Sequence, residues 1–502
     1  MDALEQSASE VLSLIRSVKN SFAPIGRIPP EVLSLIPDYW DTERHPDRDI
    51  IKLTHVCHGW REIFISRSSL WTRLDFMDVN KTLTYLQRSN SSPLDVHLKD
   101  TGRKTYLDRA FPLVIPHIHR LKSLIVDADT LPHILRHFRF RAPHLEELGI
   151  NITSYPTQIL DPALFDGDLS SLRELSLVGV TTSLPWRHME KLRVLSLSGQ
   201  EITVSQILDF LESSPLLETV EIGDSIPETS DAPPGRLVPL GNLKTLIITA
   251  DPVHSILKHL DIPVGVLLKV WASFGGDRSP LLEYLPEASP NLKNLSYITM
   301  TNLCFYPEAK CARLSGPSGG LRLFAPWEDE AIPSSMMDNR ILRSLGPSTL
   351  STTQRLTILN YTPRNPANDE ECPVFRALSS ANDLQTLILS ECNNKPFIFA
   401  LNPDKNPSKL VLCPNLKKIE FYARSWGFIK NLISMAKRRA AKGAKLPSIT
   451  LTGLDSTAPG AEVLKLREHV TQVQHRVKMA PILWDYIPDP GDCGDILEEL
   501  LA

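Results

Sequence analysis

The chain has 502 residues, of which 42% are hydrophobic and 22% are charged. This composition is typical of a folded globular protein and argues against a disordered one. The length exceeds that of one ordinary compact domain but suits a repeat array, whose core grows as units are added. The net charge of −4 provides no basic field for nucleic acid. No run approaches the roughly 18 apolar residues of a membrane span, so we expect neither a nucleic-acid nor a membrane partner.

The seven cysteines are odd in number and form no C-x-x-C pair. Such a set indicates free, mostly buried thiols in a reducing compartment. Acidic residues among the first ten positions argue against a secretory signal. We therefore expect a cytoplasmic or nuclear protein, or one that is present in both compartments.

Residues 1–23 are expected to form an amphipathic helix. Its apolar positions recur at steps of four and three, which gives a coiled-coil-like seam of Leu4, Ala8, Val11, Ile15, Val18 and Phe22. A seam this short forms a weak coiled coil by itself. Packing on the next domain, or fraying in solvent, is therefore an alternative for this helix.

Residues 24–78 contain two short segments with apolar residues at helical spacing. Pro29 and Pro30 suit a helix start, where a fixed φ and a missing N–H cost little. The apolar faces are Val32, Leu33 and Ile36 in the first segment, and Ile50, Leu53, Val56 and Trp60 in the second. Small helices with this much apolar surface need a partner or a neighbouring domain to cover it.

The order of these residues resembles the F-box family. The family pattern leucine-proline-x-glutamate-aliphatic corresponds to residues 28–32, and its second half to Asp49-Ile50, Leu53, Val56-Cys57 and Trp60-Arg61. The chain departs from the pattern at Ile28, in the charged loop 41–48 and at His58. The resemblance implies that Skp1 binds segment 24–78 through Ile28, Pro29, Glu31, Val32, Ile36, Val56 and Trp60. The alternative is a helical cap that covers the following repeats and does not bind Skp1.

Residues 79–475 carry a self-similar phrase, leucine-x-x-leucine-x-leucine, which starts at Leu172 and again 20 residues later at Leu192. Further units begin at 121, 145, 217, 243, 292, 384, 416 and 446, with weaker ones at 264, 321 and 355. Each unit predicts a strand whose leucines need stacked neighbours to be buried. Helical spacing lies between strands, as at 131–138 and 204–211, and prolines precede several strands.

This pattern predicts an α/β fold. We expect a leucine-rich-repeat solenoid, with parallel strands inside and helices on the convex side, preceded by the small all-α F-box module. The usual asparagine after the third leucine is mostly absent, so the repeats are irregular. The whole chain resembles F-box proteins with leucine-rich repeats, a type abundant in mushroom-forming fungi.

The C-terminal part continues this pattern as far as residue 475. A helix, a strand and a last helix near 461–474 are expected in segment 425–475. The basic run at 437–445 is either an import signal or the solvated face of a helix. Residues 476–502 are acidic from Asp485 onward, which predicts a disordered tail or a short capping helix.

The sequence shows no catalytic or metal-binding constellation. His133 and His137 are four residues apart but lack the glutamate of a zinc-protease motif. Cys304 and Cys311 lack two further ligands at suitable spacing. The glycine-rich segment 316–320 lacks the lysine of a phosphate loop and is expected to be a flexible loop. We therefore expect no enzymatic activity, no cofactor and no metal.

The F-box resemblance implies the function of a substrate-recognition subunit in an SCF-type ubiquitin ligase. Skp1 would connect the chain to cullin and RING subunits, and the repeats would hold an unidentified target protein. One alternative is a leucine-rich interaction scaffold that acts outside any ubiquitin ligase. Another is an enzyme whose site is assembled from loops that motif searching does not detect.

The expected target surface is the concave face of the repeats. Residues that alternate with the buried leucines would form it: Ser176, Val178, Ser196, Ser198, Glu221, Ile247, Ile388 and Glu420. In this register the two isoleucines are exposed, and the two glutamates add negative charge. A target with an apolar anchor and basic flanks would fit. Coverage of this face by the C-terminal tail or a long loop, with the target bound elsewhere, is the alternative.

Overall fold

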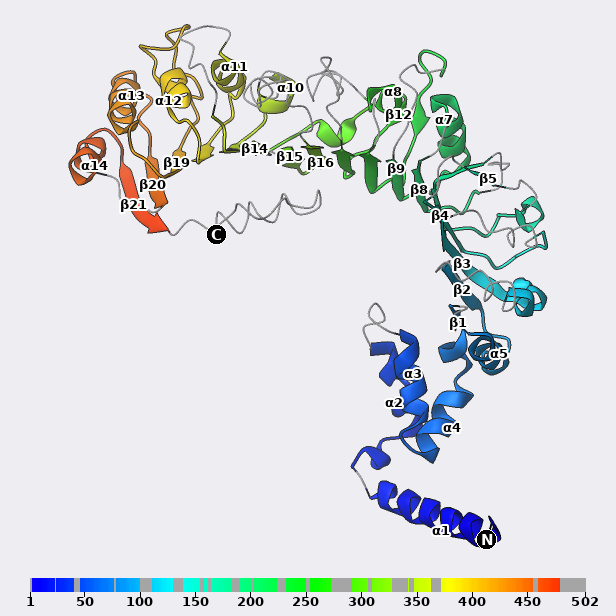
Figure 1. Cartoon of the computed structure of the whole chain (residues 1–502). Coiled ribbons are helices and arrows are strands. Elements are labelled where there is room, and N and C mark those ends of the chain that lie inside the picture. The colour runs from blue at the N-terminus through cyan, green and yellow to red at the C-terminus, as the bar shows by residue number, and fades with distance from the viewer. Residues whose placement is uncertain are drawn as a thin grey trace. The chain divides into compact units, whose positions relative to one another are not determined.

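The computed structural model divides into two compact units, Met1–Leu192 and Arg193–Ala502. The residues that it describes are 2–22, 24–39, 46–75, 78–99, 111–129, 139–153, 158–160, 164–182, 189–199, 202–223, 232–249, 253–271, 291–305, 309–326, 342, 347–362, 372–454 and 459–478. Both units combine helices with mainly parallel strands (Figure 1). The fold is therefore mixed α/β, as predicted.

The first unit begins with helices. They are α1 (Asp2–Ser21), the 3-10 helix η1 (Pro24–Arg27), α2 (Pro30–Ser34), η2 (Ile36–Tyr39), α3 (Pro46–Thr54), α4 (His58–Ser66) and η3 (Ser68–Trp71). Pro30 occupies the first turn of α2, where its fixed φ favours helix initiation. The predicted N-terminal helix is present, but its apolar residues Val11, Ile15 and Val18 are more than half exposed.

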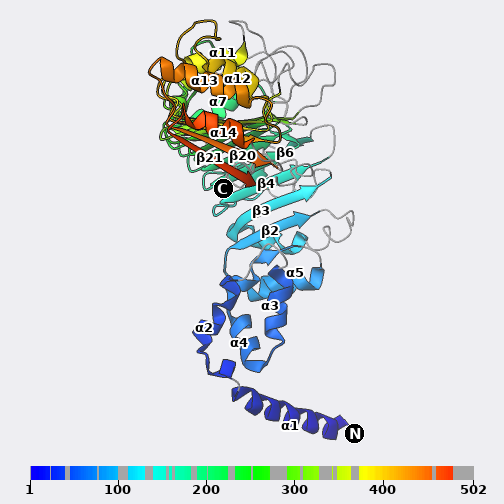
Figure 2. The ribbon, with the colours of Figure 1, turned by 90° about the vertical axis from the view of Figure 1, so that its left-hand side faces the viewer.

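A parallel sheet follows in the first unit. Strands β1 (Arg73–Leu74), β2 (Leu94–Lys99), β3 (Leu121–Ala128), β4 (Glu147–Ile152) and β6 (Glu174–Val178) pair in chain order (Figure 2). A smaller parallel pair joins β5 (Gln158–Leu160) to β7 (Val180–Thr182). Helix α5 (Val79–Arg88) and 3-10 helices η4 (Phe111–Leu113), η5 (Ile115–Arg120) and η7 (Leu164–Gly167) connect these strands.

The second unit contains a longer sheet. Its parallel strands β8 (Val194–Ser198), β9 (Thr219–Gly223), β11 (Thr245–Thr249) and β13 (Leu267–Trp271) pair in order. Strands β17 (Arg355–Leu359), β18 (Thr386–Ser390), β19 (Lys418–Ala423), β20 (Ser448–Leu454) and β21 (Gln472–Lys478) form a second parallel run. The short strands β10 (Val238–Pro239) and β12 (Leu260–Asp261) pair separately.

An antiparallel meander joins these two parallel runs. It consists of β14 (Met300–Phe305), β15 (Ala309–Gly316) and β16 (Gly319–Pro326). Strand β16 pairs with β13, and β14 pairs with β17, both in parallel. The spatial order is therefore β13, β16, β15, β14, β17, so the chain order is reversed at the centre of the sheet.

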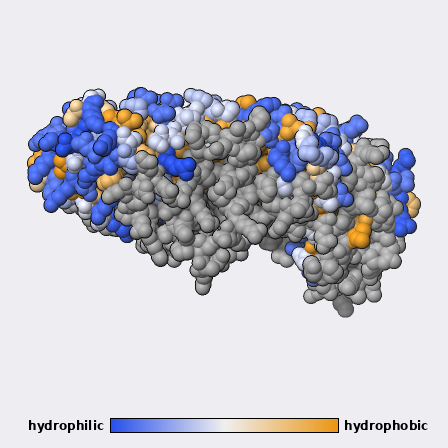
Figure 3. Space-filling view, turned by 90° about the horizontal axis from the view of Figure 1, so that it is seen from above, coloured by the Kyte–Doolittle hydropathy of each residue, from blue (hydrophilic) through white to orange (hydrophobic). Residues whose placement is uncertain are grey.

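Helices cover one face of this sheet (Figure 1). They are α7 (Val204–Ser213), α8 (His254–Leu257), α10 (Pro347–Leu350), α11 (Pro373–Ser380), α12 (Lys395–Leu401), α13 (Ile429–Ala441) and α14 (Gly460–Arg467). Helix α7 starts with a capping box, in which Thr203 and Gln206 exchange side-chain and backbone hydrogen bonds. From above, the end that carries α13 and α14 is mostly hydrophilic (Figure 3).

The core is built from strand residues that point toward the helices. Leu195 and Leu197 in β8 are at most 3% exposed, and Ser196 between them is half-buried. The same alternation places Leu175 and Leu177 of β6 in the core of the first unit, with Ser176 on the other face. Strand periodicity in the sequence therefore identified the buried positions of β6 and β8 correctly.

Strands occur at nearly all of the predicted units, including the weaker ones at 264, 321 and 355. The unit at 292 was predicted wrongly, because a 3-10 helix, η9 (Lys293–Leu295), lies there. The buried amide of Asn294 donates to the backbone carbonyls of Val266 and Gly320, at 3.3 and 3.1 Å. These bonds favour a turn at this position, and the strand β14 begins later.

Two other local predictions were wrong, and one lies outside the described residues. The segment 316–320 is a tight hairpin in which Gly319 has φ +112, a value that favours glycine. The last helix ends at Arg467, and residues 472–478 form strand β21. The expected helix at 131–138 lies outside the described residues.

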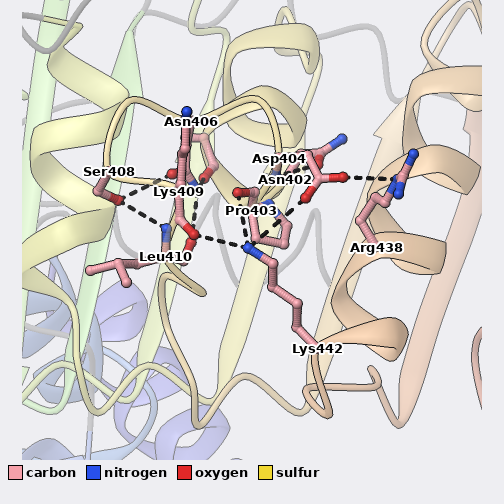
Figure 4. Close-up of polar contacts among 10 residues, drawn as sticks. Asn402, Pro403, Asp404, Asn406, Ser408, Lys409, Leu410, Arg438 and Lys442 are labelled. Carbon is pink, nitrogen blue, oxygen red and sulfur yellow. Dashed lines mark hydrogen bonds and ion pairs between the residues drawn. The ribbon is translucent and has the colours of Figure 1, made fainter.

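The basic run on α13 is largely used to hold a neighbouring loop (Figure 4). Arg438 lies 3.0 Å from the carboxylate of Asp404, and Lys442 donates to the carbonyl of Lys409 at 2.9 Å. Arg439 is buried and donates to two backbone carbonyls of the segment before β19. These contacts favour a structural role for the run over an import signal.

Candidate binding surfaces

The helical module of residues 24–78 has a small apolar core. Leu33 of α2, Leu53 of α3 and Phe64 of α4 are at most 6% exposed. The ring of Trp60 meets that of Phe64 edge-on at 5.6 Å, and the Trp71 indole donates to the Phe64 carbonyl at 2.9 Å. The Trp60 contact lies within α4, whereas the Trp71 hydrogen bond ties the following 3-10 helix η3 to α4.

Polar contacts with the backbone tie the helices of this module together. The Nε atom of Arg61 donates to the carbonyl of Thr54, at the end of α3, at 2.9 Å. Arg67, which follows α4, donates to the carbonyl of Ser34 at the end of α2. Both carbonyls lie in the last turn of a helix, where intrahelical donors are missing. Figure 2 shows α2, α3 and α4 as one group.

Several of the expected Skp1-binding residues remain at the surface. Val32 and Val56 are 52% and 55% exposed, and Pro29 and Glu31 are also exposed. The remaining three are half-buried: Ile28, Ile36 and Trp60. Val32 and Val56 are therefore accessible to a partner.

Sequence reasoning missed two residues of this apolar surface. Leu35, the residue that follows α2, and Ile51 of α3 are 45% and 38% exposed. The signal was present, because each lies beside a residue that the helical pattern placed on an apolar face. Helical spacing in the sequence marks the apolar positions of these helices. It does not tell which of them are buried in the core of the module and which stay at its surface, because that depends on packing.

Six of the expected target-binding residues lie where predicted, on the strand face that points away from the core leucines. Ser176 and Val178 are half-buried on β6 of the first unit. In the second unit, Ser196 pairs with Glu221, and Glu221 pairs with Ile247. The Ser196 hydroxyl donates to the Glu221 carboxylate at 3.3 Å. Ser198 is also half-buried, at the end of β8.

The other two residues, Ile388 and Glu420, pair directly across β18 and β19. Ile388 was expected to be exposed, but it is only 2% exposed. Thr357, its register partner on the other side, is fully buried. Ile388 is therefore buried, and the prediction that it serves as an exposed apolar contact for a target is wrong.

Glu420 is part of a local polar network. The Lys418 amine lies 2.7 Å from its carboxylate, and the Tyr422 hydroxyl donates to it at 3.3 Å. Burial and the nearby Glu420 charge raise the pKa of Tyr422 above its ordinary value. The phenol therefore stays protonated at neutral pH and remains a donor.

Between these two acidic positions the sheet face is basic. Lys269 on β13 pairs with Arg322 on β16, and Arg322 pairs with Arg313 on β15. Each of the three is half-buried and lies between fully buried strand neighbours, so all three point away from the core. The sequence analysis missed this row, since it did not anticipate that β15 inserts between β14 and β16.

The part of the chain that the structure describes shows no group of three or more His, Cys, Asp or Glu residues able to hold a metal ion. Among the same residues, no helix combines the length and apolar character needed to cross a membrane. Cys304 and Cys311 are register partners on β14 and β15, and Cys304 is a free, buried cysteine.

Comparison with known proteins identifies the helical module. A family model described as F-box-like matches residues 25–77. No curated protein matches the chain. The matched range begins in η1, covers α2, α3 and α4, and includes the exposed Val32 and Val56. Residues 25–77 are therefore an F-box-like domain.

Proposed function

We propose that this protein is a substrate-recognition subunit of an SCF-type ubiquitin ligase. F-box domains generally bind Skp1 in such complexes, and residues 25–77 are an F-box-like domain. The observation that carries the proposal is the exposure of two aliphatic side chains of this domain, Val32 and Val56. Burial of these side chains against Skp1 would stabilise the complex through the hydrophobic effect.

The strand and helix units would hold the target. Repeated burial of leucines, as at Leu172, Leu175 and Leu177, supports a proposal that these units are irregular leucine-rich repeats. Skp1 would link the chain to the cullin and RING subunits, and the repeats would bring the target close to the ubiquitin-loaded enzyme. Ubiquitin transfer to the target would be accelerated by proximity alone, and this chain would not itself catalyse the reaction.

The cysteines support a reducing location for this role. Five described cysteines are free: Cys57, Cys304, Cys372, Cys392 and Cys413. Free thiols persist where glutathione and thioredoxin keep them reduced, so we place the protein in the cytoplasm, the nucleus or both.

A binding titration with Skp1 tests the proposal. The full chain is expected to bind Skp1, and the double variant Pro29→Ala/Glu31→Ala is expected to bind it more weakly. Both residues are exposed, so the variant should keep the thermal unfolding temperature of the parent chain. A full chain that binds no Skp1 would refute the ligase role and favour the alternative, an interaction scaffold that acts outside any ubiquitin ligase.

A further inference from the structure

Helix α1 exposes apolar side chains along one face. Figure 1 shows α1 as one continuous helix. Val11, Leu12, Leu14 and Ile15 have exposed fractions between 53% and 66%, and Phe22, directly after the helix, is 73% exposed. Because a single helix cannot bury such a face by itself, these side chains need apolar surface from elsewhere.

The apolar positions of α1 repeat every seven residues. Ala8, Ile15 and Phe22 form one column of this repeat, and Val11 lies between Ala8 and Ile15 on the same face. Residues seven apart on an α-helix lie within about 20° of one another, so the column keeps to one face along the helix. Alternating steps of three and four are the spacing of a seam between two helices. The face therefore has the pattern that packs against a second helix.

One flank of this seam carries its charges in a symmetric order. Glu5, Leu12 and Lys19 are seven residues apart, each lies beside the seam, and all three are exposed. At 1.5 Å per residue, Glu5 and Lys19 lie about 10.5 Å from Leu12 in opposite directions. In an antiparallel pair of these helices centred on Leu12, Glu5 of each copy is therefore level with Lys19 of the other.

The other flank decides against a parallel pair. It consists of Ser7, Leu14 and Ser21, none of which is charged. In a parallel coiled coil the two different flanks of the partner helices lie side by side, whereas in an antiparallel one each flank lies beside its own counterpart. Only the antiparallel pair therefore brings Glu5 and Lys19 together.

We propose that α1 pairs antiparallel with α1 of a second copy of this chain. The pair forms two contacts between Glu5 and Lys19, one at each end, and charges beside the seam set the partner and the orientation of coiled coils. At the centre, Val11 of each copy packs against Ile15 of the other, and Leu12 meets its own counterpart. The pairing uses α1 and not the F-box-like domain, so it goes beyond the proposed function and does not depend on Skp1 binding.

Sedimentation equilibrium of the full chain tests the pairing, at concentrations from about 1 to about 100 µM. The parent chain is expected to move from the mass of one chain, 56.2 kDa, toward twice that mass as its concentration rises. Val11→Asp/Ile15→Asp is expected to stay monomeric, because both changes place a charge in the seam. Both residues are exposed, so thermal unfolding should be unchanged. A parent chain that is monomeric throughout would overturn the proposal.

Charge exchange tests the antiparallel orientation. Glu5→Lys and Lys19→Glu are each expected to raise the dissociation constant of the dimer about tenfold, because two attractive contacts become repulsive. A one-to-one mixture of these two variants is expected to form a heterodimer, since each end of the pair then brings a lysine against a glutamate. A mixture that forms no heterodimer would overturn the antiparallel arrangement.

Two matched variants separate these contacts from a general charge effect. Glu10→Lys changes the net charge as Glu5→Lys does, but Glu10 is exposed at a position outside the seam and both flanks. It is expected to dimerise like the parent chain, as is Glu5→Lys/Lys19→Glu, which keeps opposite charges in both contacts. Equal loss of the dimer in Glu10→Lys and Glu5→Lys would overturn the proposal.

Two further arms examine other occupants of the apolar face. A monomeric parent chain that co-sediments with vesicles of phosphatidylcholine and phosphatidylserine would overturn the proposal in favour of a membrane surface. Skp1 binding is measured on the parent and on Val11→Asp/Ile15→Asp, and equal affinities are expected. Loss of Skp1 binding in that variant would assign the face of α1 to Skp1 instead.

The same measurements distinguish this pairing from the ligase role. A parent chain that dimerises through α1 but does not bind Skp1 would refute the ligase role and leave the antiparallel pairing in place. A parent chain that binds Skp1 but stays monomeric would refute only the pairing.

Discussion

Removal of the exposed valine side chains from the F-box-like domain should weaken Skp1 binding by a predictable amount. Val32 and Val56 are 52% and 55% exposed, so about half of each side chain is available to a partner. Truncation to alanine removes two carbons, worth about 1.6 kcal/mol when fully buried at ~0.8 kcal/mol each. Because only about half of each side chain is newly buried, each substitution is expected to cost about 0.8 kcal/mol of binding free energy. The double variant Val32→Ala/Val56→Ala should therefore lose about 1.6 kcal/mol, which corresponds to about 15-fold weaker binding.

The assay is isothermal titration of purified Skp1 into the full chain and the double variant. Thermal unfolding is recorded for both, and it should be nearly unchanged, because substitutions at exposed positions usually alter stability by about 0.5 kcal/mol or less. The chain offers a matched control in Val264→Ala/Val477→Ala, since these valines are 60% and 56% exposed and lie far along the chain. The control should bind Skp1 like the parent. A dissociation constant for Val32→Ala/Val56→Ala within about twofold of the parent would refute the reasoning, because the exposed surface would then lie outside the interface.

Three further outcomes follow from buried groups. Leu175→Ala should lower the free energy of unfolding by about 2–5 kcal/mol in a denaturant titration, whereas Ser176→Ala beside it should change it little. Arg439→Met should cost about 1–3 kcal/mol for each backbone carbonyl left without its donor, and exposed Lys437→Met should be neutral. Burial raises the pKa of the Cys413 thiol from 9.0 to about 12, so iodoacetamide should leave Cys413 unmodified in the folded chain near neutral pH. Because this pKa is higher in the folded state, its contribution to stability should be complete below pH 9.0 and lost as the pH rises toward about 12.

The strands at the leucine phrases were predictable because their sequence signal is local and recurs along the chain. Leucines at alternate positions, such as Leu195 and Leu197, need burial, and their neighbour Ser196 does not. The unit at 292 has leucines at the same spacing, but Asn294 lies at a central position of the phrase. The buried amide of Asn294 bonds backbone carbonyls from distant strands, and sequence spacing carries no information on such contacts.

The F-box-like domain shows a second limit of sequence reasoning. Helical spacing placed Val32 and Leu33 on one apolar face, yet Leu33 is 4% exposed and Val32 is 52% exposed. Adjacent residues on a short helix point in directions about 100° apart, so only one of them can face the core. The pattern identified the apolar surface, but the packing against α4 decides which residues are left for a partner.

The basic row could not be read from the sequence, because it depends on a reversal of strand order. Lys269 and Arg313 are far apart in the chain, and a regular repeat array would separate their strands by several units. Strand β15 lies between β14 and β16, so Arg313 pairs with Arg322, and Arg322 pairs in turn with Lys269 on its other side. In a regular array, acidic and apolar residues such as Glu221 and Ile247 would have set the charge of this sheet face. The sequence analysis accordingly expected a target with an apolar anchor and basic flanks. The antiparallel meander instead brings Lys269, Arg322 and Arg313 into one register row at the centre of the sheet, and no spacing in the sequence indicates that arrangement.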